Sequence, residues 1–446
     1  MILINRKSDN QLRAPVQCSR LLLQRLSIVV ALGLMMTTSA AAETVLIKGG
    51  KVMTLGEAGT LARADILVRD DRIVNVAADL SDSPVDRTID ASGKLVTPGL
   101  WAPITELGLI EIGAAASTND AAVMDEHIGA AFDPVPAFNP RSTLIPFNRA
   151  GGITRAIVMP ASEDKIFAGK GFAINLSGSF DSVVKPSLAQ RIYLGEYGAE
   201  LAGGSRANAY AQVKAALTQA REYADNKAAI RRGDWRTLDY SLEDLAALQP
   251  IISGEQPVLI RADRASDILQ VLELADTFRL NVIIEGAAEG WMVAEQLAAA
   301  GVPVVLDPLR NSPDAFERLG ARLENPALLQ KAGVTILIGS PGYAGTHNSY
   351  LSRQGAGNAV AYGLPYDEAL KAVSVNIARA FGFDGGVIAP GAVADIVIWS
   401  GDPLEVTSHP EVVLIDGATQ SLVTRSTRLR DRYLHPKPGH EHGYSY

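Results

Sequence analysis

The chain has 446 residues, 47% of them hydrophobic and 20% charged, with 40 glycines and 23 prolines. This composition is typical of a globular protein and excludes disordered, collagen-like and coiled-coil classes. The net charge of -8 argues against the basic surface that nucleic-acid binding requires, and the single cysteine, Cys18, excludes an intrachain disulfide.

Residues 1–42 are predicted to form a secretory signal peptide. Basic residues lead into the apolar run IVVALGLMM (28–36), which is too short to span a hydrocarbon core of ~30 Å. Small residues follow, and Ala40-x-Ala42 fits a cleavage site. The alternative is an amphipathic N-terminal helix of the mature protein. No later run reaches transmembrane length, so we expect an exported, periplasmic protein with no membrane span in its mature form.

Short β-strands are predicted at both ends of the mature chain. The N-terminal runs are TVLIKGGKVMT (44–54), DILVRDDRIVNV (65–76, with a turn at Asp70-Asp71) and IDASGKLVT (89–97). The C-terminal runs are GGVIAPGAVADIVIWSG (385–401) and EVVLIDGATQSLVTR (411–425). We expect the two ends to pair into one small β-sandwich, because an isolated set of N-terminal hairpins would have weak stability of its own.

Between these ends, apolar strands alternate with Ala/Leu-rich helices. The strands are ITRAIVM (153–159), PVLIRA (257–262), NVIIE (281–285), VPVVL (302–306) and VTILIG (334–339). The helical stretches are 205–228, 265–279 and 290–300. This alternation predicts an α/β fold with a parallel sheet, best fitted by a TIM (β/α)8 barrel, with a doubly wound open sheet as the alternative. The glycines of GKGFAINLSG (169–178) lack the order of a phosphate-binding loop and are interpreted as turns.

The predicted organisation therefore has five parts. They are a signal peptide (1–42), the first part of the sandwich (43–98), the barrel (99–385), the second part of the sandwich (386–430) and a flexible tail (431–446).

Several short blocks of the sequence resemble segments of the amidohydrolase superfamily, and they occur in the same order along the chain. VLIKGG (45–50), IDASG (89–93) and VTPGL (96–100) resemble its N-terminal segments, and NIARAFG (376–382), GVIAPGAVAD (386–395) and VVLIDG (412–417) its C-terminal ones. RADRASDIL (261–269) and IIEGAAEG (283–290) look like the imidazolonepropionase-like branch. The resemblance implies a TIM barrel with a composite β-sandwich, and hydrolysis of non-peptide carbon–nitrogen bonds, often in cyclic amides, by zinc or another divalent metal.

The sequence departs from this family at the metal ligands. The His-x-His pair expected after the PGL segment is replaced by Ile104 and Glu106. Histidines expected at the next two strand ends are replaced, at RAD (261–263) by Arg261 and Asp263 and in the following strand by Gly286. The aspartate expected after the last strand is replaced by SPG (340–342), and the family's carboxylated lysine cannot be placed. We therefore predict no family-type metal ligands and expect no cofactor.

Few histidines remain to rebuild such a site. Only His127, His347 and His409 lie within the folded body. The tail segment HEH (440–442) could chelate a metal weakly, although a solvated tail is the simpler interpretation. If His127 and His347 converged with two carboxylates at one point, a rebuilt metal site would exist.

Polar residues at the predicted strand ends are the candidate site. We assign catalytic roles to Glu106 and Asp263, and substrate binding to a second group comprising Arg261, Glu285, Asp307 and His347. The alternatives are that Arg261 pairs with Asp263 or a neighbouring acid as a structural set, and that His347 is an exposed loop residue. Glu106 and Asp263 could also hold one hard cation, magnesium or calcium, with water.

Two functions follow. One is an exported amidohydrolase-type hydrolase of non-peptide carbon–nitrogen bonds, which is catalytically degenerate or works with an unusual metal set or without metal. The other is a non-catalytic pseudoenzyme of the periplasm that binds a small molecule. In either case the expected partner is a small-molecule ligand or substrate, and the sequence determines neither its identity nor the oligomeric state.

Overall fold

The computed structural model describes residues 43–124, 127–234, 238–339 and 343–434. The predicted signal peptide (1–42), segment 340–342 and segment 440–442 lie outside these ranges. Part of the predicted flexible tail is helical, since α14 (Arg425–Leu434) runs to its last described residue. Thr424 explains where this helix begins, because its hydroxyl accepts a hydrogen bond from the Thr427 amide at 3.1 Å.

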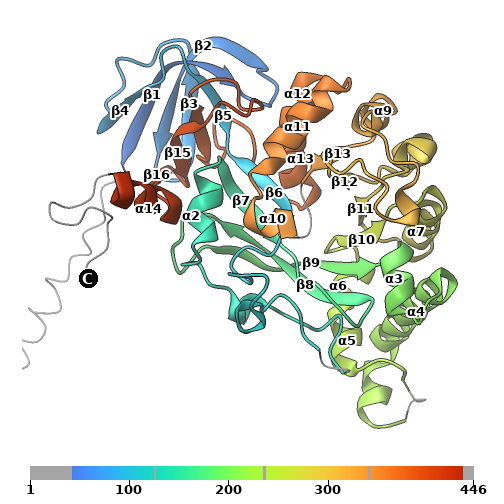
Figure 1. Ribbon diagram of the computed structural model, residues 1–446. Helices are drawn as coiled ribbons and strands as arrows, with labels where there is room; N and C mark the ends of the chain where they lie inside the picture. Colours follow the sequence, from blue (N-terminus) through green and yellow to red (C-terminus); the bar gives the residue numbers. More distant parts are fainter. Residues whose placement is uncertain (1–42, 125–126, 235–237, 340–342, 435–446) are drawn as a thin grey trace, which may run out of the picture. The chain divides into compact units, whose positions relative to one another are not determined.

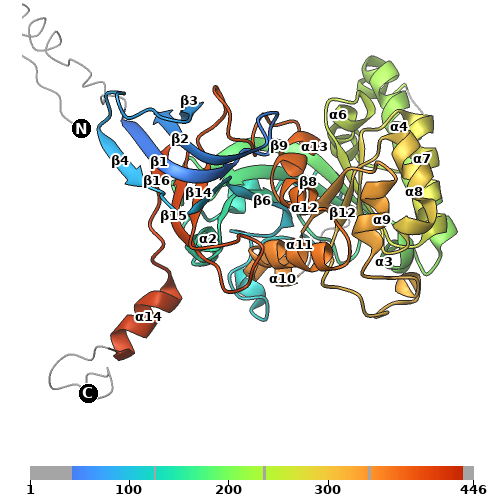
Figure 2. The same ribbon diagram turned by 90° about the horizontal axis from the view of Figure 1, so that it is seen from above.

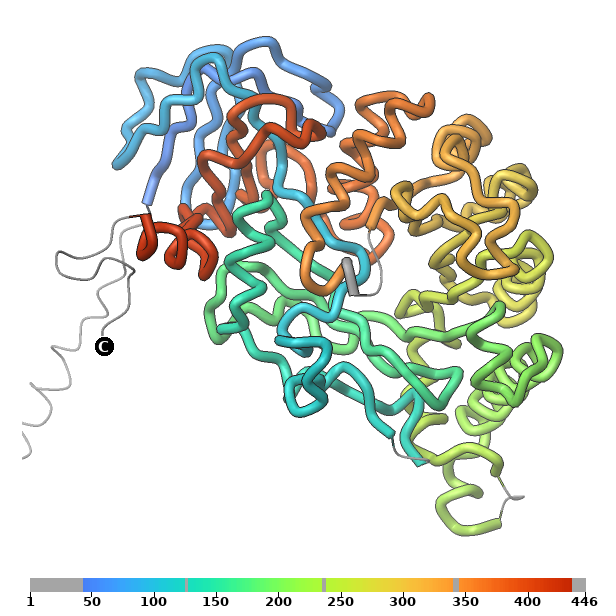
Figure 3. The backbone as a smooth tube through the Cα atoms, in the orientation of Figure 1, coloured from blue at the N-terminus to red at the C-terminus, as the bar shows by residue number. Residues whose placement is uncertain are grey.

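Strands from both ends of the chain form the first sheet. They are β1 (Thr44–Met53), β2 (Thr60–Arg69), β3 (Arg72–Ala77), β4 (Arg87–Asp90), β5 (Leu95–Pro98), β14 (Ile396–Trp399), β15 (Pro410–Ile415) and β16 (Ala418–Thr419). The strand order is β16-β15-β14-β5-β1-β2-β3, and β4 pairs with β1. The C-terminal strand β14 pairs antiparallel with β5, with Ile396 opposite Pro98. The two ends of the chain thus run side by side, blue beside red in Figures 1 and 3.

This first sheet encloses a hydrophobic core of its own. Alternating side chains along its strands point to one face, as in any β-strand. The buried members include Val45, Ile47, Ile66, Val68 and Val96 from the N-terminal strands and Ile388, Ile396, Ile398 and Leu414 from the C-terminal segment. The two halves share this core, so neither end can bury its apolar face without the other.

The second sheet is a nearly closed barrel of eight strands. They are β6 (Leu100–Thr105), β7 (Ile153–Val158), β8 (Phe167–Asn175), β9 (Val183–Tyr193), β10 (Val258–Ala262), β11 (Val282–Gly286), β12 (Val304–Leu306) and β13 (Ile336–Ile338). They follow one another in chain order, and β13 comes back beside β6. The predicted barrel is therefore confirmed and the doubly wound sheet is excluded.

Helices cover the outside of the barrel, as Figure 2 shows for α4, α7, α8 and α9. The α-helices are α2 (Leu144–Arg149), α3 (Gly195–Leu201), α4 (Arg206–Arg231), α5 (Leu242–Ala247), α6 (Gln249–Ile252), α7 (Ala265–Phe278), α8 (Ala294–Ala300), α9 (Asn325–Lys331), α10 (Tyr343–His347), α11 (Leu351–Ala361), α12 (Tyr366–Ala372) and α13 (Val375–Ala380). Short 3-10 helices lie at η1 (Ala116–Thr118), η2 (Val135–Ala137), η3 (Gly290–Val293) and η4 (Phe316–Arg318). In α7, the buried residues Ile268, Val271 and Leu274 recur at helical spacing. Among the helices of the described ranges, none is long and apolar enough to cross a membrane.

The interpretation of residues 169–178 as turns is wrong for Gly169 and Gly171, because strand β8 extends over Phe167–Asn175. It holds only after the strand, where residues 176–177 form a turn that Gly178 follows. This strand runs antiparallel to both of its neighbours, so the barrel is not wholly parallel. Its glycines are required by close packing: a Cβ on Gly171 would overlap the Met159 sulfur, and Gly169 (φ +116°) lies against the Phe132 carbonyl. The glycines thus reflect crowding inside a strand, which the pattern alone does not distinguish from turns.

The barrel interior is filled by a layer of apolar side chains, one or two from each strand. The members include Ile104, Ile157, Met159, Ala189, Leu259, Ile283, Val305 and Leu337. This layer closes the barrel below the strand ends. The residues two positions further along the same strands point into the space above it.

Candidate functional site

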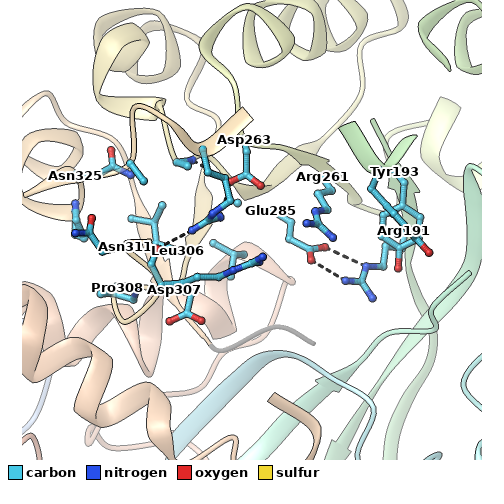
Figure 4. Close-up of a pocket in the computed structure, with 18 of the residues that line it drawn as sticks. Arg191, Tyr193, Arg261, Asp263, Glu285, Leu306, Asp307, Pro308, Asn311 and Asn325 are labelled. Carbon is cyan, nitrogen blue, oxygen red and sulfur yellow. Dashed lines mark hydrogen bonds and ion pairs between the residues drawn. The ribbon is translucent and has the colours of Figure 1, made fainter. Parts of the chain in front are cut away.

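Charged residues lie directly above this apolar layer. Because side chains alternate along a strand, the residues two positions after the layer face the same interior space. They are Glu106, Arg191, Arg261, Glu285 and Asp307, and all five line a cavity of about 300 Å³. Figure 4 shows the last four of them, together with Asp263, which lines the same cavity. The structure thus brings together five of the predicted site residues, and adds Arg191.

Arg191 and Glu285 form a buried ion pair across this cavity. Arg191 donates from Nε to Oε2 of Glu285 at 3.0 Å and from Nη2 to Oε1 at 2.7 Å, as the dashed lines in Figure 4 show. Its Nη1 donates to the carbonyl oxygen of Pro160 at 3.0 Å. Burial alone would lower the pKa of Arg191, but the adjacent Glu285 carboxylate raises it above the ordinary value. The guanidinium is therefore a fixed, permanent cation.

Asp263 is held by a second arginine. The side chain of Asp263 is 1% exposed, and its Oδ1 accepts hydrogen bonds from Arg318 Nη1 and from the Ala288 amide, both at 3.1 Å. Arg318 is in turn fixed by donation from Nη2 to the Arg310 carbonyl at 2.6 Å. Arg261 is therefore not the partner of either neighbouring carboxylate, and the pairing expected from the sequence is wrong. Arg318 lies 55 positions from Asp263, so no local pattern reveals it.

Arg261 instead lies against aromatic rings. Its guanidinium carbon is 5.7 Å from the ring centre of Tyr197, and Tyr197 packs edge-on against Tyr193 at 5.0 Å. The Tyr197 hydroxyl donates to the Ser162 carbonyl at 2.6 Å, which fixes the ring. Burial raises the pKa of Tyr193 to about 12. Within the described part of the chain, the Arg261 side chain has this cation–π contact and no hydrogen bond or ion pair.

Besides Glu163, two carboxylates of the cavity are outside these ion pairs. Glu106 accepts a hydrogen bond from the Thr346 hydroxyl at 2.5 Å, and Asp307 accepts one from the Leu309 amide at 3.1 Å. Burial raises the pKa of Asp307 above its ordinary value. Neither carboxylate is in an ion pair with any described residue.

The histidines lie apart from one another. His347 in α10 places Nε2 3.3 Å from the Glu111 carbonyl oxygen and does not line the cavity. His127 lines a different cavity, and His409 contacts Ser400 in the segment between β14 and β15. Among the residues that the structure describes, no three His, Cys, Asp or Glu side chains are arranged to hold a metal. The rebuilt site with His127 and His347 is thus not formed.

Comparison with known proteins identifies the barrel. The amidohydrolase family profile matches residues 205–426. This domain belongs to the amidohydrolase family. An amidohydrolase from Thermotoga maritima MSB8 has the same fold, with a TM-score of 0.76, 25% identity and coverage of 85% of this chain and 100% of that one.

Two deaminases are also similar to this chain. The 5'-deoxyadenosine deaminase of Methanothermobacter thermautotrophicus is 23% identical over 380 residues, covering 80% of this chain and 84% of its own. The 5-methylthioadenosine/S-adenosylhomocysteine deaminase of Halobacterium salinarum is 25% identical over 439 residues, covering 88% and 94%. A mutant atrazine chlorohydrolase from Arthrobacter aurescens TC1, complexed with zinc and atraton, shares the fold with a TM-score of 0.53 at 18% identity, covering 86% and 98%.

Amidohydrolases typically use a divalent metal such as zinc, but the donor set in this chain does not fit one. Ile104 belongs to the apolar layer, and Gly286 (φ +105°) has no room for a side chain, since a Cβ there would lie 2.7 Å from Oδ1 of Asp263. Asp263 itself is committed to Arg318. Residues 340–342, outside the described ranges, contribute no carboxylate or imidazole by sequence. Of the positions that would ligate zinc, Ile104 is thus apolar, Gly286 is crowded and Asp263 is neutralised, which leaves Glu106 as a carboxylate outside an ion pair with any described residue.

Sequence reasoning missed Arg191, Tyr193, Tyr197 and Arg318. A signal did exist for the first two, because Ala189, Arg191 and Tyr193 alternate along β9. That signal was missed because Pro186 and the polar residues around it are not typical of a strand. For Tyr197 and Arg318, only the tertiary structure shows the contact.

Proposed function

We propose that this protein binds a small molecule in the mouth of the barrel and does not hydrolyse it by the metal-dependent route. One observation carries the proposal: the carboxylates of Asp263 and Glu285 are each neutralised by a buried arginine. A carboxylate that is already paired with a guanidinium is a poor ligand for a further cation, because its charge is neutralised and its oxygens accept hydrogen bonds. The homologues act on small molecules, which supports a ligand of that size.

A second candidate is hydrolysis of a carbon–nitrogen bond without the family metal. It is favoured by Asp307, whose carboxyl lies in the cavity, has a raised pKa because of burial, and is in no ion pair with a described residue. A carboxyl with a raised pKa is a better candidate for proton transfer than a carboxylate that is paired with an arginine. Glu106, the predicted catalytic residue at the former ligand position, lines the same cavity.

Metal content and turnover distinguish these functions. The protein is purified without a tag, its zinc, manganese and iron are measured, and ammonia release from 5'-deoxyadenosine and 5-methylthioadenosine is followed. We expect metal well below one equivalent and no release above the blank. Stoichiometric metal with turnover that a chelator abolishes would overturn the proposal.

The same assay with Asp307→Asn tests the second candidate. Metal-independent turnover that this variant loses would establish acid–base hydrolysis. The control is Asp234→Asn, which removes an exposed carboxylate that pairs with Arg232 and lies outside the cavity lining.

We also propose that the protein is exported to the periplasm and cleaved after Ala42. The basic, apolar and small-residue order of residues 1–42 supports this proposal. N-terminal sequencing of the mature protein from its native cell should begin at Glu43. Recovery of a cytoplasmic chain that retains residues 1–42 would contradict it.

A further inference from the structure

We propose that Arg261 anchors a carboxylate group of the bound small molecule. The inference rests on the proposed function, since it concerns the ligand of the same cavity. Arg261 lies near the end of β10, beside Glu285 of β11 and Tyr193 of β9 in the strand register. Its guanidinium points into the cavity mouth in Figure 4. Its backbone is therefore held in β10 between two neighbouring strands, while its side chain faces the space that a ligand would occupy.

The other arginines that line this cavity already have anionic partners. The pairs are Arg191–Glu285 at 2.7 Å, Arg310–Asp314 at 2.6 Å, Arg318–Asp263 at 3.1 Å and Arg322–Glu324 at 3.1 Å. Arg261 has no such partner in the described ranges. Its positive charge is thus available to a ligand, whereas a ligand that bound another of these arginines would have to displace a carboxylate of the protein.

Tyr197 holds the Arg261 side chain in a geometry suited to a planar anion. The guanidinium carbon lies 5.7 Å from the ring centre, and the ring is fixed by the hydrogen bond from its hydroxyl to the Ser162 carbonyl. No described residue forms a hydrogen bond with the N–H groups of this guanidinium, so they are available to a ligand. Two parallel N–H groups match the two oxygens of a carboxylate, and the order that Tyr197 imposes on the side chain reduces the entropy lost on binding.

The charge balance of the cavity favours one singly charged anion with a hydrogen-bond donor. Beside the unpaired Arg261, the lining presents Glu106, Glu163 and Asp307, none of which is in an ion pair with a described residue. A phosphate dianion would meet these carboxylates with only one available cation. A monocarboxylate that also carries an N–H donor complements both the cation and the carboxylates of the lining. Its carboxylate would face Arg261, and its N–H would face Glu106 or Asp307. The ligand class is therefore small N–H-bearing carboxylic acids, such as amino-acid derivatives.

Chemical modification tests this assignment on the protein alone, before its natural ligand is identified. Phenylglyoxal reacts with accessible guanidinium groups, and mass spectrometry locates the modified peptide. In the full-length mature protein, we expect Arg261 to be modified at least tenfold faster than Arg191 or Arg318. N-acetyl-L-alanine, N-acetyl-L-leucine and N-acetyl-L-phenylalanine should protect Arg261, and the corresponding amides should not. Equal protection by acids and amides, or no protection by any acid, would overturn the assignment.

Binding measurements with the same matched pairs give an independent test. Calorimetry should show at least one acid bound tenfold or more tightly than its amide. Arg261→Gln should abolish that preference, and Arg261→Lys should restore part of it. The control, Arg264→Gln, removes a nearby arginine that pairs with Asp267 and does not line the cavity, and it should keep the preference.

The outcomes separate this inference from the proposed function. Binding of acids and amides with equal affinity would refute the role of Arg261 while leaving a small-molecule pocket. Metal-dependent turnover together with a preference that Arg261→Gln abolishes would refute the proposed function while leaving the carboxylate anchor.

Discussion

Arg191 and Glu285 form a buried ion pair that is costly to break. Both side chains are about 5% exposed or less, so removal of one partner leaves the other charged and poorly solvated. A buried pair contributes less net stability than its attraction suggests, because desolvation opposes it. The pair is therefore better understood as fixing the cavity geometry than as the source of stability.

We expect Glu285→Ala to lower the free energy of unfolding by about 3–5 kcal/mol, because Arg191 would remain buried without its partner. The double variant Arg191→Met/Glu285→Leu should lose much less. Urea denaturation of Arg191→Met, of Glu285→Leu and of the double variant measures the coupling between the two residues. The exposed pair provides the control, since Arg322→Ala should change stability by less than about 1 kcal/mol. Equal losses at the two pairs would contradict this account.

Tyr193 makes stability depend on alkaline pH. Burial raises its pKa from an ordinary value of 10.0 to about 12, so the folded state retains a proton that the unfolded state has lost. This contribution is complete below pH 10 and is lost as the pH rises towards 12, which lowers the free energy of unfolding by about 3 kcal/mol. In Tyr193→Phe, the loss between pH 10 and 12 should be smaller by that amount. Parallel urea titrations of the two proteins measure the difference, and identical slopes would contradict the burial of this hydroxyl.

At the scale of elements, two tight turns that are distant in sequence pack against each other. Gly417 lies between β15 and β16 with φ +74°, and an added Cβ would overlap the carbonyl oxygen of Asp70, in the turn between β2 and β3. The C-terminal hairpin thus rests directly on an N-terminal turn. A side chain at this position must separate two parts of the first sheet.

We expect Gly417→Ala to cost about 3 kcal/mol, from backbone strain together with displacement of the Asp70 backbone. Gly391→Ala is the matched control, since Gly391 also has positive φ (+86°) but has open space around its Cβ position. That control should cost only about 1 kcal/mol. The difference between their urea midpoints tests the clash, and equal midpoints would show that the turn yields without cost.

At the scale of the whole molecule, the first sheet closes the chain on itself. Strand β14 lies between β5 and β15, and the shared core draws on residues from both ends. Arg155 of β7 adds a buried link to the barrel, because it donates to Asp395 just before β14 and to Asp416 just after β15. The sheet and the barrel are therefore bound together by more than chain connectivity.

A chain that ends at Asp384 should fail to fold, because its loss of β14 exposes the edge of β5 and removes apolar side chains such as Ile396 and Ile398 from the core. A chain that ends at Thr424 loses only α14 among the described elements, and no residue of that helix is buried. Its melting temperature should change by less than about 2 °C. Soluble, cooperatively unfolding protein from the shorter chain would contradict the shared core.

Much of the fold was predictable because strand and helix periodicities report burial locally. Apolar runs located β10 to β13, and β-rich runs at both ends indicated a common sheet. Strand β8 was missed because close packing, rather than a turn, requires Gly171. The resemblance to amidohydrolases and the missing ligands at Ile104 and Gly286 also came from the sequence, since both depend on residue identity in chain order.

The sequence by itself indicated most of the charged residues at the mouth of the barrel, because alternation along each strand fixes the face that a side chain occupies, although it missed Arg191 and Arg318. Only the tertiary structure decided how those charges pair. Arg191 reaches Glu285 across 94 positions and Arg318 reaches Asp263 across 55, while Arg261 is left beside Tyr197. Hydrogen bonds and ion pairs depend on ångström-scale distances between side chains, and the closure of the barrel, rather than any local pattern, sets those distances.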